Sequence, residues 1–208
     1  MADLTFYTNP MSRGRIVRWM LEEAGVPYDT ELVDYGASGM KSTAYRVINP
    51  MGKVPAIRHG ETIVTECAAI CAYLADAFPE AGLAPDVTSP ARGSYYRWLF
   101  FAAGPLEQAV TNRALGFVAA PEHSRMLGYG SYEDVLSTIE GAVSGRQYLA
   151  GDRFSVADLY VGAQLSWGMM SGRIEKRPAF EAYADPLMAR PAAVRAREID
   201  GALAPPRD

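Results

Sequence analysis

The chain has 208 residues, of which 49% are hydrophobic and 21% charged, so it can form one large domain or two small ones with a sizeable core. Its formal net charge is -4 and it has no long block of like charges, which argues against a nucleic-acid partner. No apolar run reaches the roughly 18 residues of a membrane-spanning helix, and the first residues resemble a strand more than a signal peptide. We therefore expect a cytoplasmic protein with no membrane partner.

The first part of the chain alternates between strand and helix patterns. Its first helix carries an apolar stripe that includes Ile16 and Met20, with Arg18 expected on the polar side. Gly25 and Pro27 end this helix, because glycine accepts the left-handed conformation and proline cannot continue the helix. The elements expected here are strands at residues 4–8 and 28–34 and helices at 15–24 and 41–48.

Residues 49–76 carry the most informative run of the chain. Pro55 falls inside a short apolar segment, where it removes one ladder donor and so favours an edge or special strand. Glu66 stands at the start of a helix, whose unsatisfied N–H groups form a natural anion site. With strands at 54–58 and 62–65 and a helix at 67–78, the order becomes βαβαββα, which predicts a compact α/β domain with a mixed sheet.

From residue 91 onward the patterns are helical, so the fold class is an α/β N-terminal domain followed by an all-α C-terminal domain. We expect domains at 1–80 and 91–208, joined by a proline-rich linker at 81–90. Gly104 and Pro105 should kink or restart the first long helix. Ser155 and Asp158 have the spacing of a capping box, and we expect them to matter for folding and not for catalysis.

The two cysteines, Cys67 and Cys71, lie four residues apart and therefore on one helix face. Two thiols cannot form a disulfide framework, and the two histidines have no spacing typical of zinc, so we expect no metal. Cys71 is interpreted as a small buried residue. Cys67 lies in the first turn of its helix, where a thiol can become redox-sensitive.

The segments NPMGKVPAI, at residues 49–57, and TECAAICAYLAD, at 65–76, together resemble the glutathione-binding half of the soluble glutathione S-transferases. The resemblance implies a thioredoxin-like fold, a cis bond before Pro55, and pairing of the Val54 backbone with the cysteinyl part of glutathione. It places the γ-glutamyl end at Glu66 and at Cys67, which stands where the family usually has serine. Glutathione would be a co-substrate, and a homodimer is implied by the resemblance alone.

In this family the enzyme holds the glutathione thiol as a thiolate. Ser12 corresponds to the catalytic serine of theta-like enzymes, which is cysteine in the bacterial beta-like ones, and Tyr7 corresponds to the strand tyrosine of alpha- and mu-like enzymes. We favour Ser12, because a loop residue at the mouth of a helix is well placed to meet a ligand. Arg13 is a candidate for added positive field, and Lys53 is expected near the glutathione backbone or its glycyl carboxylate.

The second substrate, a small hydrophobic electrophile, is expected in an apolar pocket between the domains. Met11, Tyr96 and Phe100 are the candidates for its lining. Trp167, Met169 and Met170 are interpreted as packing residues. The sequence thus predicts a glutathione S-transferase that conjugates glutathione to such an electrophile, while a glutathione-dependent isomerase, dehalogenase or peroxidase and a non-catalytic protein-binding module stay open as alternatives.

Overall fold

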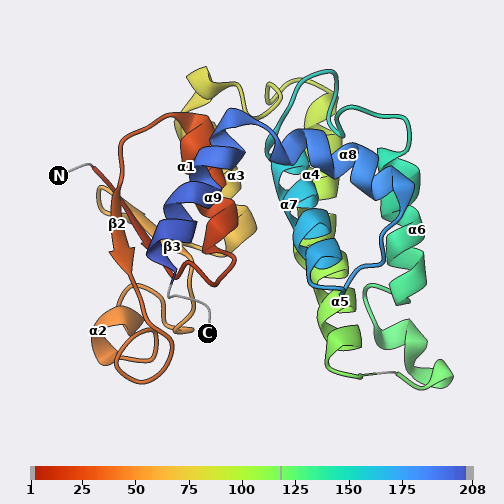
Figure 1. Ribbon diagram of the computed structural model, residues 1–208, viewed down its shortest axis with the longest axis horizontal. Helices are drawn as coiled ribbons and strands as arrows, with labels where there is room; N and C mark the ends of the chain where they lie inside the picture. The colour runs from red at the N-terminus through yellow and green to blue at the C-terminus, as the bar shows by residue number, and fades with distance from the viewer. Residues whose placement is uncertain (1–2, 118, 205–208) are drawn as a thin grey trace. The chain divides into compact units, whose positions relative to one another are not determined.

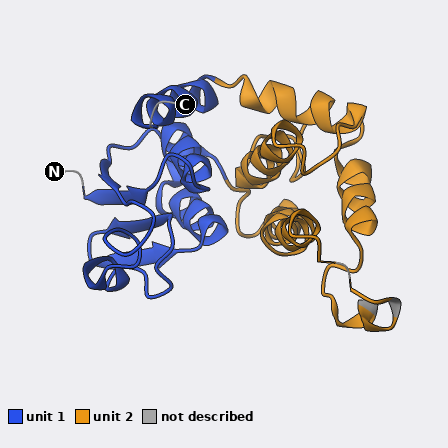
Figure 2. Ribbon diagram, turned by 60° about the horizontal axis from the view of Figure 1, so that its bottom comes forward, with its two compact units in different colours: residues 1–83, 191–208 blue, residues 84–190 orange. Residues whose placement is uncertain are grey.

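A computed structural model describes residues 3–117 and 119–204. The chain divides into two compact units, coloured separately in Figure 2: unit 1 comprises residues 1–83 and 191–208, and unit 2 comprises residues 84–190. Within the described residues, no helix is both long and apolar enough to cross a membrane. Each unit has its own buried core, so each is described by itself.

Unit 1 is built on a mixed four-stranded sheet of order β2-β1-β3-β4. β1 pairs parallel with β2 and antiparallel with β3, which in turn pairs antiparallel with β4. The order βαβαββα is therefore confirmed (Figure 1). The strands are β1 (Leu4–Thr8), β2 (Asp29–Leu32), β3 (Ala56–His59) and β4 (Thr62–Thr65), and the helices of this unit are α1 (Gly14–Ala24), α2 (Thr43–Arg46), α3 (Cys67–Ala77) and α9 (Pro191–Leu203).

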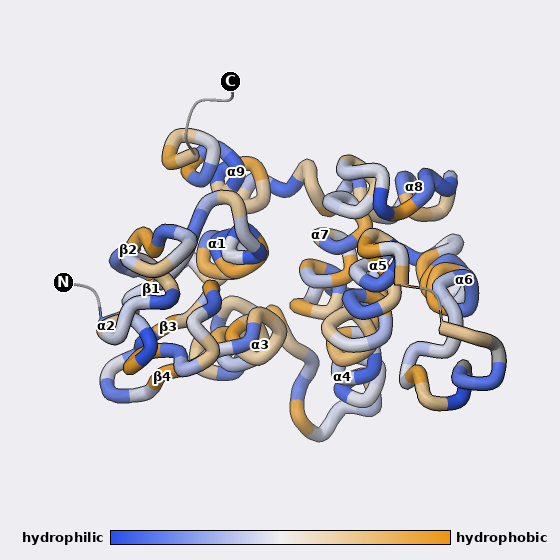
Figure 3. Tube along the Cα trace, turned by 90° about the horizontal axis from the view of Figure 1, so that it is seen from below, coloured by the Kyte–Doolittle hydropathy of each residue, from blue (hydrophilic) through white to orange (hydrophobic). Residues whose placement is uncertain are grey.

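The two faces of the sheet have separate apolar clusters, because successive side chains of a strand point to opposite faces. Phe6 and Ile57 are fully buried, as are Val17 of α1 and Leu74 of α3. Figure 3 shows α3 largely in the apolar colours, which agrees with a helix buried beside α1. A second cluster, to which Tyr7 contributes, is formed by Val33, Met40, Tyr45, Ile48 and Ala56.

Helix α1 ends as the sequence predicts, since Gly25 takes a φ of 67° and its N–H donates to the Leu21 carbonyl. The expectation for Arg18 was wrong. Its side chain is only 1% exposed and its Nε donates to Asp200 Oδ1 of α9 at 3.0 Å. The α-helical period alone had placed Arg18 opposite the apolar stripe, but α9 covers that side of α1 (Figure 1).

Helix α9 therefore packs with the N-terminal part of the chain. The expected ranges assigned all of 91–208 to one helical domain, whereas the structure groups residues 191–208 with unit 1. The physical reason is that α9 has a partner on α1, including the buried pair between Arg18 and Asp200. Unit 2 is thus a continuous helical segment that interrupts unit 1 in the sequence.

Unit 2 is all-helical. Gly104 and Pro105 do interrupt the first long helix, which passes through a π-helical turn at Ala102–Leu106. Pro105 cannot donate an i→i−4 bond, and the regular α-helix is interrupted at this point. Its α-helices are α4 (Ala91–Phe101), α5 (Glu107–Ala114), α6 (Tyr132–Val143), α7 (Val156–Met170) and α8 (Pro178–Met188), with 3-10 turns at Pro79–Ala81, just before this unit, and at Pro121–Met126.

The capping box at the start of α7 is present. Asp158 is fully buried, and its Oδ2 accepts from the Ser155 main-chain N–H at 2.8 Å and from the Ser155 hydroxyl at 2.9 Å. Its Oδ1 accepts from the Leu149 N–H and the Tyr183 hydroxyl, both at 2.7 Å. Asp158 therefore ties the start of α7 to α8 and to the loop before α7, which suits a role in folding.

Candidate functional site

The C-terminal ends of β1, β2 and β4 and the N-terminal end of β3 lie at the same end of the sheet in unit 1. Thr8, the last residue of β1, follows the antiparallel pair of Tyr7 and Ala56, and Ala56 also pairs with Thr65, the last residue of β4. The loop after β1, the segment before β3 and the start of α3 consequently lie beside one another. A main-chain hydrogen bond from Val33 to Thr8, at 2.8 Å, adds the end of β2 to this end of the sheet.

Ser12 lies in the loop between β1 and α1 and is half-buried. Its hydroxyl donates to the Asn9 carbonyl at 2.7 Å and accepts from the Gly14 N–H at 2.9 Å. The main-chain N–H of Ser12 donates to the same Asn9 carbonyl at 3.0 Å. The oxygen of Ser12 is thereby fixed at the N-terminal end of α1, where the helix dipole favours a nearby negative charge.

The carbonyl groups of this loop are all engaged in hydrogen bonds. The Asn9 carbonyl accepts from Ser12, that of Pro10 accepts from Arg15 Nε, and that of Met11 accepts from the Tyr35 hydroxyl at 3.1 Å. The Ser12 and Arg13 carbonyls accept from the first turn of α1. Because each carbonyl dipole has a donor on it, the loop repels an incoming anion less than free carbonyls would.

The segment before β3 is held by hydrogen bonds from residues that precede it in the chain. The peptide bond between Val54 and Pro55 is cis, as the resemblance implied, and β3 begins after Pro55 and not before it. The Lys53 carbonyl accepts from the Tyr45 hydroxyl at 2.7 Å and from Asn49 Nδ2 at 2.8 Å. Among the described residues, the main-chain N–H and C=O of Val54 have no hydrogen-bond partner, so both can pair with a ligand.

Glu66 precedes α3 with a φ of 66° and a ψ of 116°, and among the described residues it is the one non-glycine with positive φ. A backbone of this kind costs on the order of 1–3 kcal/mol and persists where the surrounding structure fixes it, often at functional sites. The Glu66 carboxylate is exposed and has no partner within the described part of the chain. It is therefore available to a cationic group of a ligand.

The thiols of α3 face inward. Cys67 is buried and its Sγ donates to the Arg13 carbonyl at 3.6 Å, which joins the start of α3 to the loop before α1. Cys71 is also buried, as predicted, and burial together with the neighbouring Cys67 raises the pKa of its thiol well above the ordinary value. The first turn of α3 thus presents main-chain N–H groups to a ligand, while the Cys67 side chain is directed to Arg13.

Tyr7 is half-buried in the sheet. Its ring lies against that of Tyr45, with a centroid separation of 6.0 Å, in the cluster on the sheet face away from α1 and α3. Burial raises the pKa of Tyr45 to about 12, with a smaller contribution from Tyr7. Tyr45 therefore stays neutral and keeps donating to Lys53 throughout the physiological range.

Family comparisons identify both parts of the chain. The N-terminal domain of glutathione S-transferases matches residues 11–77, and the C-terminal domain of that family matches residues 130–191. A curated glutathione S-transferase of Xanthomonas campestris is 30% identical over 176 residues, which is 81% of this chain and 84% of the relative. The chain belongs to the glutathione S-transferase family.

Solved structures of other glutathione S-transferases extend the likeness to the fold. The glutathione transferase of Methylococcus capsulatus has a TM-score of 0.78 at 30% identity, over 96% of this chain and 99% of its own. A sphingomonad glutathione S-transferase in complex with glutathione has a TM-score of 0.75 at 27% identity, over 95% and 98%. Both family domains are present, so the thioredoxin-like fold is confirmed and the chain is an enzyme of the glutathione transferase type.

In this glutathione S-transferase, the residues that are candidates for contact with the electrophilic substrate occur in both units. Met11, in the Ser12 loop of unit 1, is 53% exposed. Tyr96 and Phe100 lie on α4 of unit 2, 40% and 66% exposed, with their ring centroids 6.3 Å apart. Each of these side chains is accessible to a ligand.

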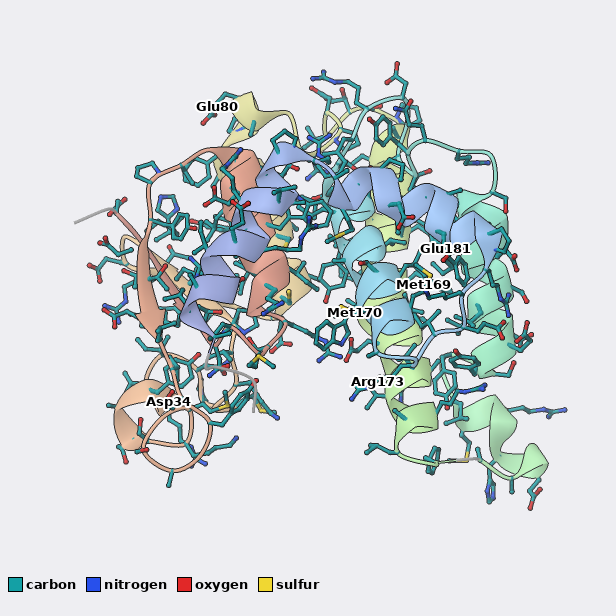
Figure 4. The ribbon with its side chains drawn as sticks, in the orientation of Figure 1. Asp34, Glu80, Met169, Met170, Arg173 and Glu181 are labelled. Carbon is teal, nitrogen blue, oxygen red and sulfur yellow. The ribbon has the colours of Figure 1, made fainter. Side chains whose placement is uncertain are left out.

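The aromatic and methionine residues of α7 divide into two kinds. Met169 is buried, which fits the packing interpretation, whereas Trp167 and Met170 are 40% and 69% exposed. Met169 and Met170 mark the C-terminal end of α7 in Figure 4. Packing within unit 2 therefore explains Met169 but not the Met170 side chain.

Several residues that support the site in this transferase, Tyr45 among them, were not found from the sequence. Asn9 and Tyr35 hold the Ser12 loop, and Lys41 Nζ donates to the Met51 carbonyl at 2.9 Å beside the turn before Lys53. Only the asparagine and proline pair at the loop start hinted at a turn. In the part of the chain that the structure describes, no group of three or more His, Cys, Asp or Glu side chains could hold a metal ion.

Proposed function

We propose that this transferase binds glutathione at the end of the sheet described above and that Ser12 stabilises the glutathione thiolate for attack on a small hydrophobic electrophile. One observation supports the proposal: the Ser12 loop, the unpaired Val54 main chain and Glu66 lie at the same end of the sheet. These are a donor for a thiolate, a partner for an extended peptide and a partner for an ammonium group. Glutathione has all three features.

The tripeptide fits these groups in order. Its γ-glutamyl carboxylate would accept from the N–H groups at the start of α3, and its ammonium would donate to Glu66. Its cysteinyl part would pair with the main chain of Val54, next to the cis bond to Pro55. The exposed Lys53 is the partner proposed for the glycyl carboxylate. Since the Cys67 thiol donates to Arg13, Cys67 would contribute its main-chain N–H alone.

Ser12 can supply much of the required stabilisation. Lowering a thiol pKa from about 8.5 to about 6.5 requires roughly 2.7 kcal/mol in favour of the thiolate. A hydrogen bond to a charged partner contributes about 1.5–3 kcal/mol, and the N-terminus of a helix adds about 0.3–1 kcal/mol. The Ser12 proton must leave the Asn9 carbonyl to make this bond, and rotation about the Cβ–Oγ bond is sufficient. We propose that Arg13 adds positive field.

Tyr7 is the weaker candidate for this role. Its ring packs in the cluster with Tyr45 on the face of the sheet away from α1, whereas Ser12 lies at the N-terminal end of that helix. On the Ser12 loop of unit 1, the electrophile would meet the exposed Met11. Tyr96 and Phe100 stay candidates on α4 of unit 2. We further propose a cytoplasmic homodimer, on the strength of family membership.

Calorimetric titration with glutathione tests the binding site directly. Glu66→Ala should weaken binding by about 10- to 100-fold, because it removes a charge-assisted hydrogen bond. Glu80→Ala is the matched control, since this exposed glutamate, labelled in Figure 4, lies in the turn Pro79–Ala81. Equal binding by both variants, or no binding by the wild type at millimolar glutathione, would contradict the proposed site.

The pH dependence of turnover with a model electrophile tests the role of Ser12. Ser12→Ala should raise the pKa of the bound thiol toward that of free glutathione while binding stays within a few-fold of wild type. Tyr7→Phe should leave that pKa unchanged. The reverse pattern, with Tyr7→Phe raising the pKa and Ser12→Ala silent, would transfer the catalytic role to Tyr7.

A further inference from the structure

Asn9 is a buried polar residue at the beginning of the Ser12 loop, with 9% of its surface exposed. We propose that Asn9 is a positioning residue for the transferase reaction: it fixes the Ser12 hydroxyl at the place from which the hydroxyl reaches the glutathione thiolate. This inference rests on the proposed function, because it assigns a role to Asn9 through Ser12. Asn9 itself touches neither substrate in this account.

The side chain of Asn9 bridges two segments. Its Nδ2 donates to the Val33 carbonyl at 3.2 Å, just beyond the end of β2, and its Oδ1 accepts from the Met11 N–H at 3.0 Å. One end of the amide is thus anchored to the sheet edge and the other to the loop. Because both ends of the amide make hydrogen bonds, the amide has one orientation, and the loop is held in a fixed position relative to the strands.

The main chain of Asn9 then holds Ser12. Its carbonyl accepts from both the Ser12 N–H, at 3.0 Å, and the Ser12 hydroxyl, at 2.7 Å. On the opposite side the Gly14 N–H donates to Ser12 Oγ at 2.9 Å. The oxygen is therefore clamped between residues 9 and 14, and the proton is the part that is free to turn.

This clamp favours transfer of the hydroxyl hydrogen bond from Asn9 to a thiolate. A hydrogen bond to an ionised acceptor is roughly twice as strong as one to a neutral carbonyl, so the hydroxyl turns to the thiolate when glutathione arrives. The Ser12 N–H stays on the Asn9 carbonyl, so the loop keeps its shape during the change. If the Asn9 side chain is removed, the loop loses its anchor and the hydroxyl samples positions from which the thiolate is out of reach.

Tyr35 braces the same loop from the exposed side. Its hydroxyl donates to the Met11 carbonyl at 3.1 Å, and its side chain is 57% exposed. The loop is thus tied to the segment after β2 by Asn9 at its buried side and by Tyr35 at its exposed side. An exposed hydrogen bond contributes less than a buried one, so we assign the main effect to Asn9.

The test is the pH dependence of the bound glutathione thiol, followed by thiolate absorbance and by the pH profile of kcat/KM. Asn9→Ala should raise the thiol pKa by about one unit, equivalent to a roughly tenfold lower thiolate fraction, which corresponds to the loss of about one hydrogen bond. Asn9→Ser, whose hydroxyl can still accept from the Met11 N–H, should recover part of the shift. Tyr35→Phe, which retains the fold, should give a smaller rise.

Asn112→Ala is the matched control. Asn112 lies on α5 of unit 2, and its Nδ2 donates to the Tyr129 hydroxyl at 3.1 Å. This variant loses one asparagine side-chain hydrogen bond, against two in Asn9→Ala, and the lost bond is not in the Ser12 loop. It should leave the thiol pKa at the wild-type value.

A double variant separates positioning from general damage. If Asn9 acts through Ser12, Asn9→Ala should add no further pKa shift once Ser12→Ala is present. An unchanged pKa in Asn9→Ala, Asn9→Ser and Tyr35→Phe, with a clear shift in Ser12→Ala, would overturn the role of Asn9 and leave the proposed function intact. Should Ser12→Ala itself shift nothing, the proposed catalytic role of Ser12 would fail, and the role of Asn9 with it.

Discussion

Replacement of Asp200 by alanine is expected to destabilise unit 1 strongly. Asp200 of α9 and Arg18 of α1 are each 1% exposed, and their Oδ1 and Nε atoms are 3.0 Å apart. Arg18 also donates to the Tyr28 hydroxyl at 3.1 Å and to Thr30 Oγ1 at 3.0 Å, and lies over the Phe6 ring at 5.0 Å from its centroid. These contacts are to neutral groups, so removing the Asp200 carboxylate leaves the buried guanidinium without its ion-pair partner.

The magnitude follows from the burial of both partners. Removal of one member of a buried ion pair costs about 3–5 kcal/mol, a large part of the roughly 5–15 kcal/mol by which a typical domain is stable. At about 2–4 °C per kcal/mol for a chain of this size, the expected drop in Tm is about 6–20 °C. Trp19 of α1 lies in unit 1, so in a Trp98→Phe and Trp167→Phe background its fluorescence follows denaturant unfolding there.

Two further variants check the reasoning behind Asp200→Ala. The combined variant Arg18→Met and Asp200→Leu removes both charges and should recover stability to within about 1 kcal/mol of wild type or exceed it. Arg195→Ala breaks an exposed pair with Glu22 on the same two helices and should cost less than about 1 kcal/mol. A loss in Asp200→Ala no larger than that in Arg195→Ala would refute a buried charge on Arg18 as the cause.

Other substitutions have defined outcomes. Gly14→Ala should cost about 1–3 kcal/mol in denaturant unfolding, because the new Cβ would lie 2.0 Å from Thr8 Oγ1, and Thr8→Ala in the same chain should relieve most of that cost. Asp158→Ala should cost about 2–4 kcal/mol of unfolding free energy without shifting the thiol pKa, since it leaves buried donors unpaired at the start of α7; a catalytic defect at equal stability would contradict this. Tyr45→Phe should lose about 1 kcal/mol and raise the KM for glutathione through the Lys53 carbonyl.

The pH dependence of stability gives one more prediction for Tyr45. Its pKa in the folded state is raised to about 12, above the ordinary value of 10.0, so folding favours the protonated phenol. The stability that it contributes is fully present below pH 10 and is lost as the pH rises through about 12. In the Tyr45→Phe variant this part of the alkaline decline in stability should be absent, and an unchanged decline would assign it to other groups.

The features predicted best from the sequence are those that depend on residues close together in the chain. The capping box of Ser155 and Asp158 needs only their spacing of three, and the strand at 62–65 has the predicted bounds. Arg18 and Asp200 are separated by 182 residues, so no local pattern relates them. For the same reason the sequence did not predict that α9 belongs to unit 1. The pattern of an amphipathic helix shows which face is buried, but not which helix packs against it.

The candidate site divides in the same way. Val54, Pro55 and Glu66 could be proposed from the sequence because two short motifs, at residues 49–57 and 65–76, contain them. Asn9 acts through contacts to Val33 and Met11, and the contact to Val33 spans 24 residues that the sequence pattern does not connect. The positive φ of Glu66 was likewise not predictable, since glutamate has no preference for that conformation.

The interrupted layout of unit 1 bears on how the chain is made. A ribosome releases residues in order, so all of residues 84–190 have been synthesised before α9 exists. Until then α1 has one face without its helical neighbour and Arg18 lacks its carboxylate partner. Unit 2, which is continuous and rich in local contacts, can fold while unit 1 is still waiting for its last helix. Unit 1, whose sheet is synthesised first, is thus the unit whose folding is completed last.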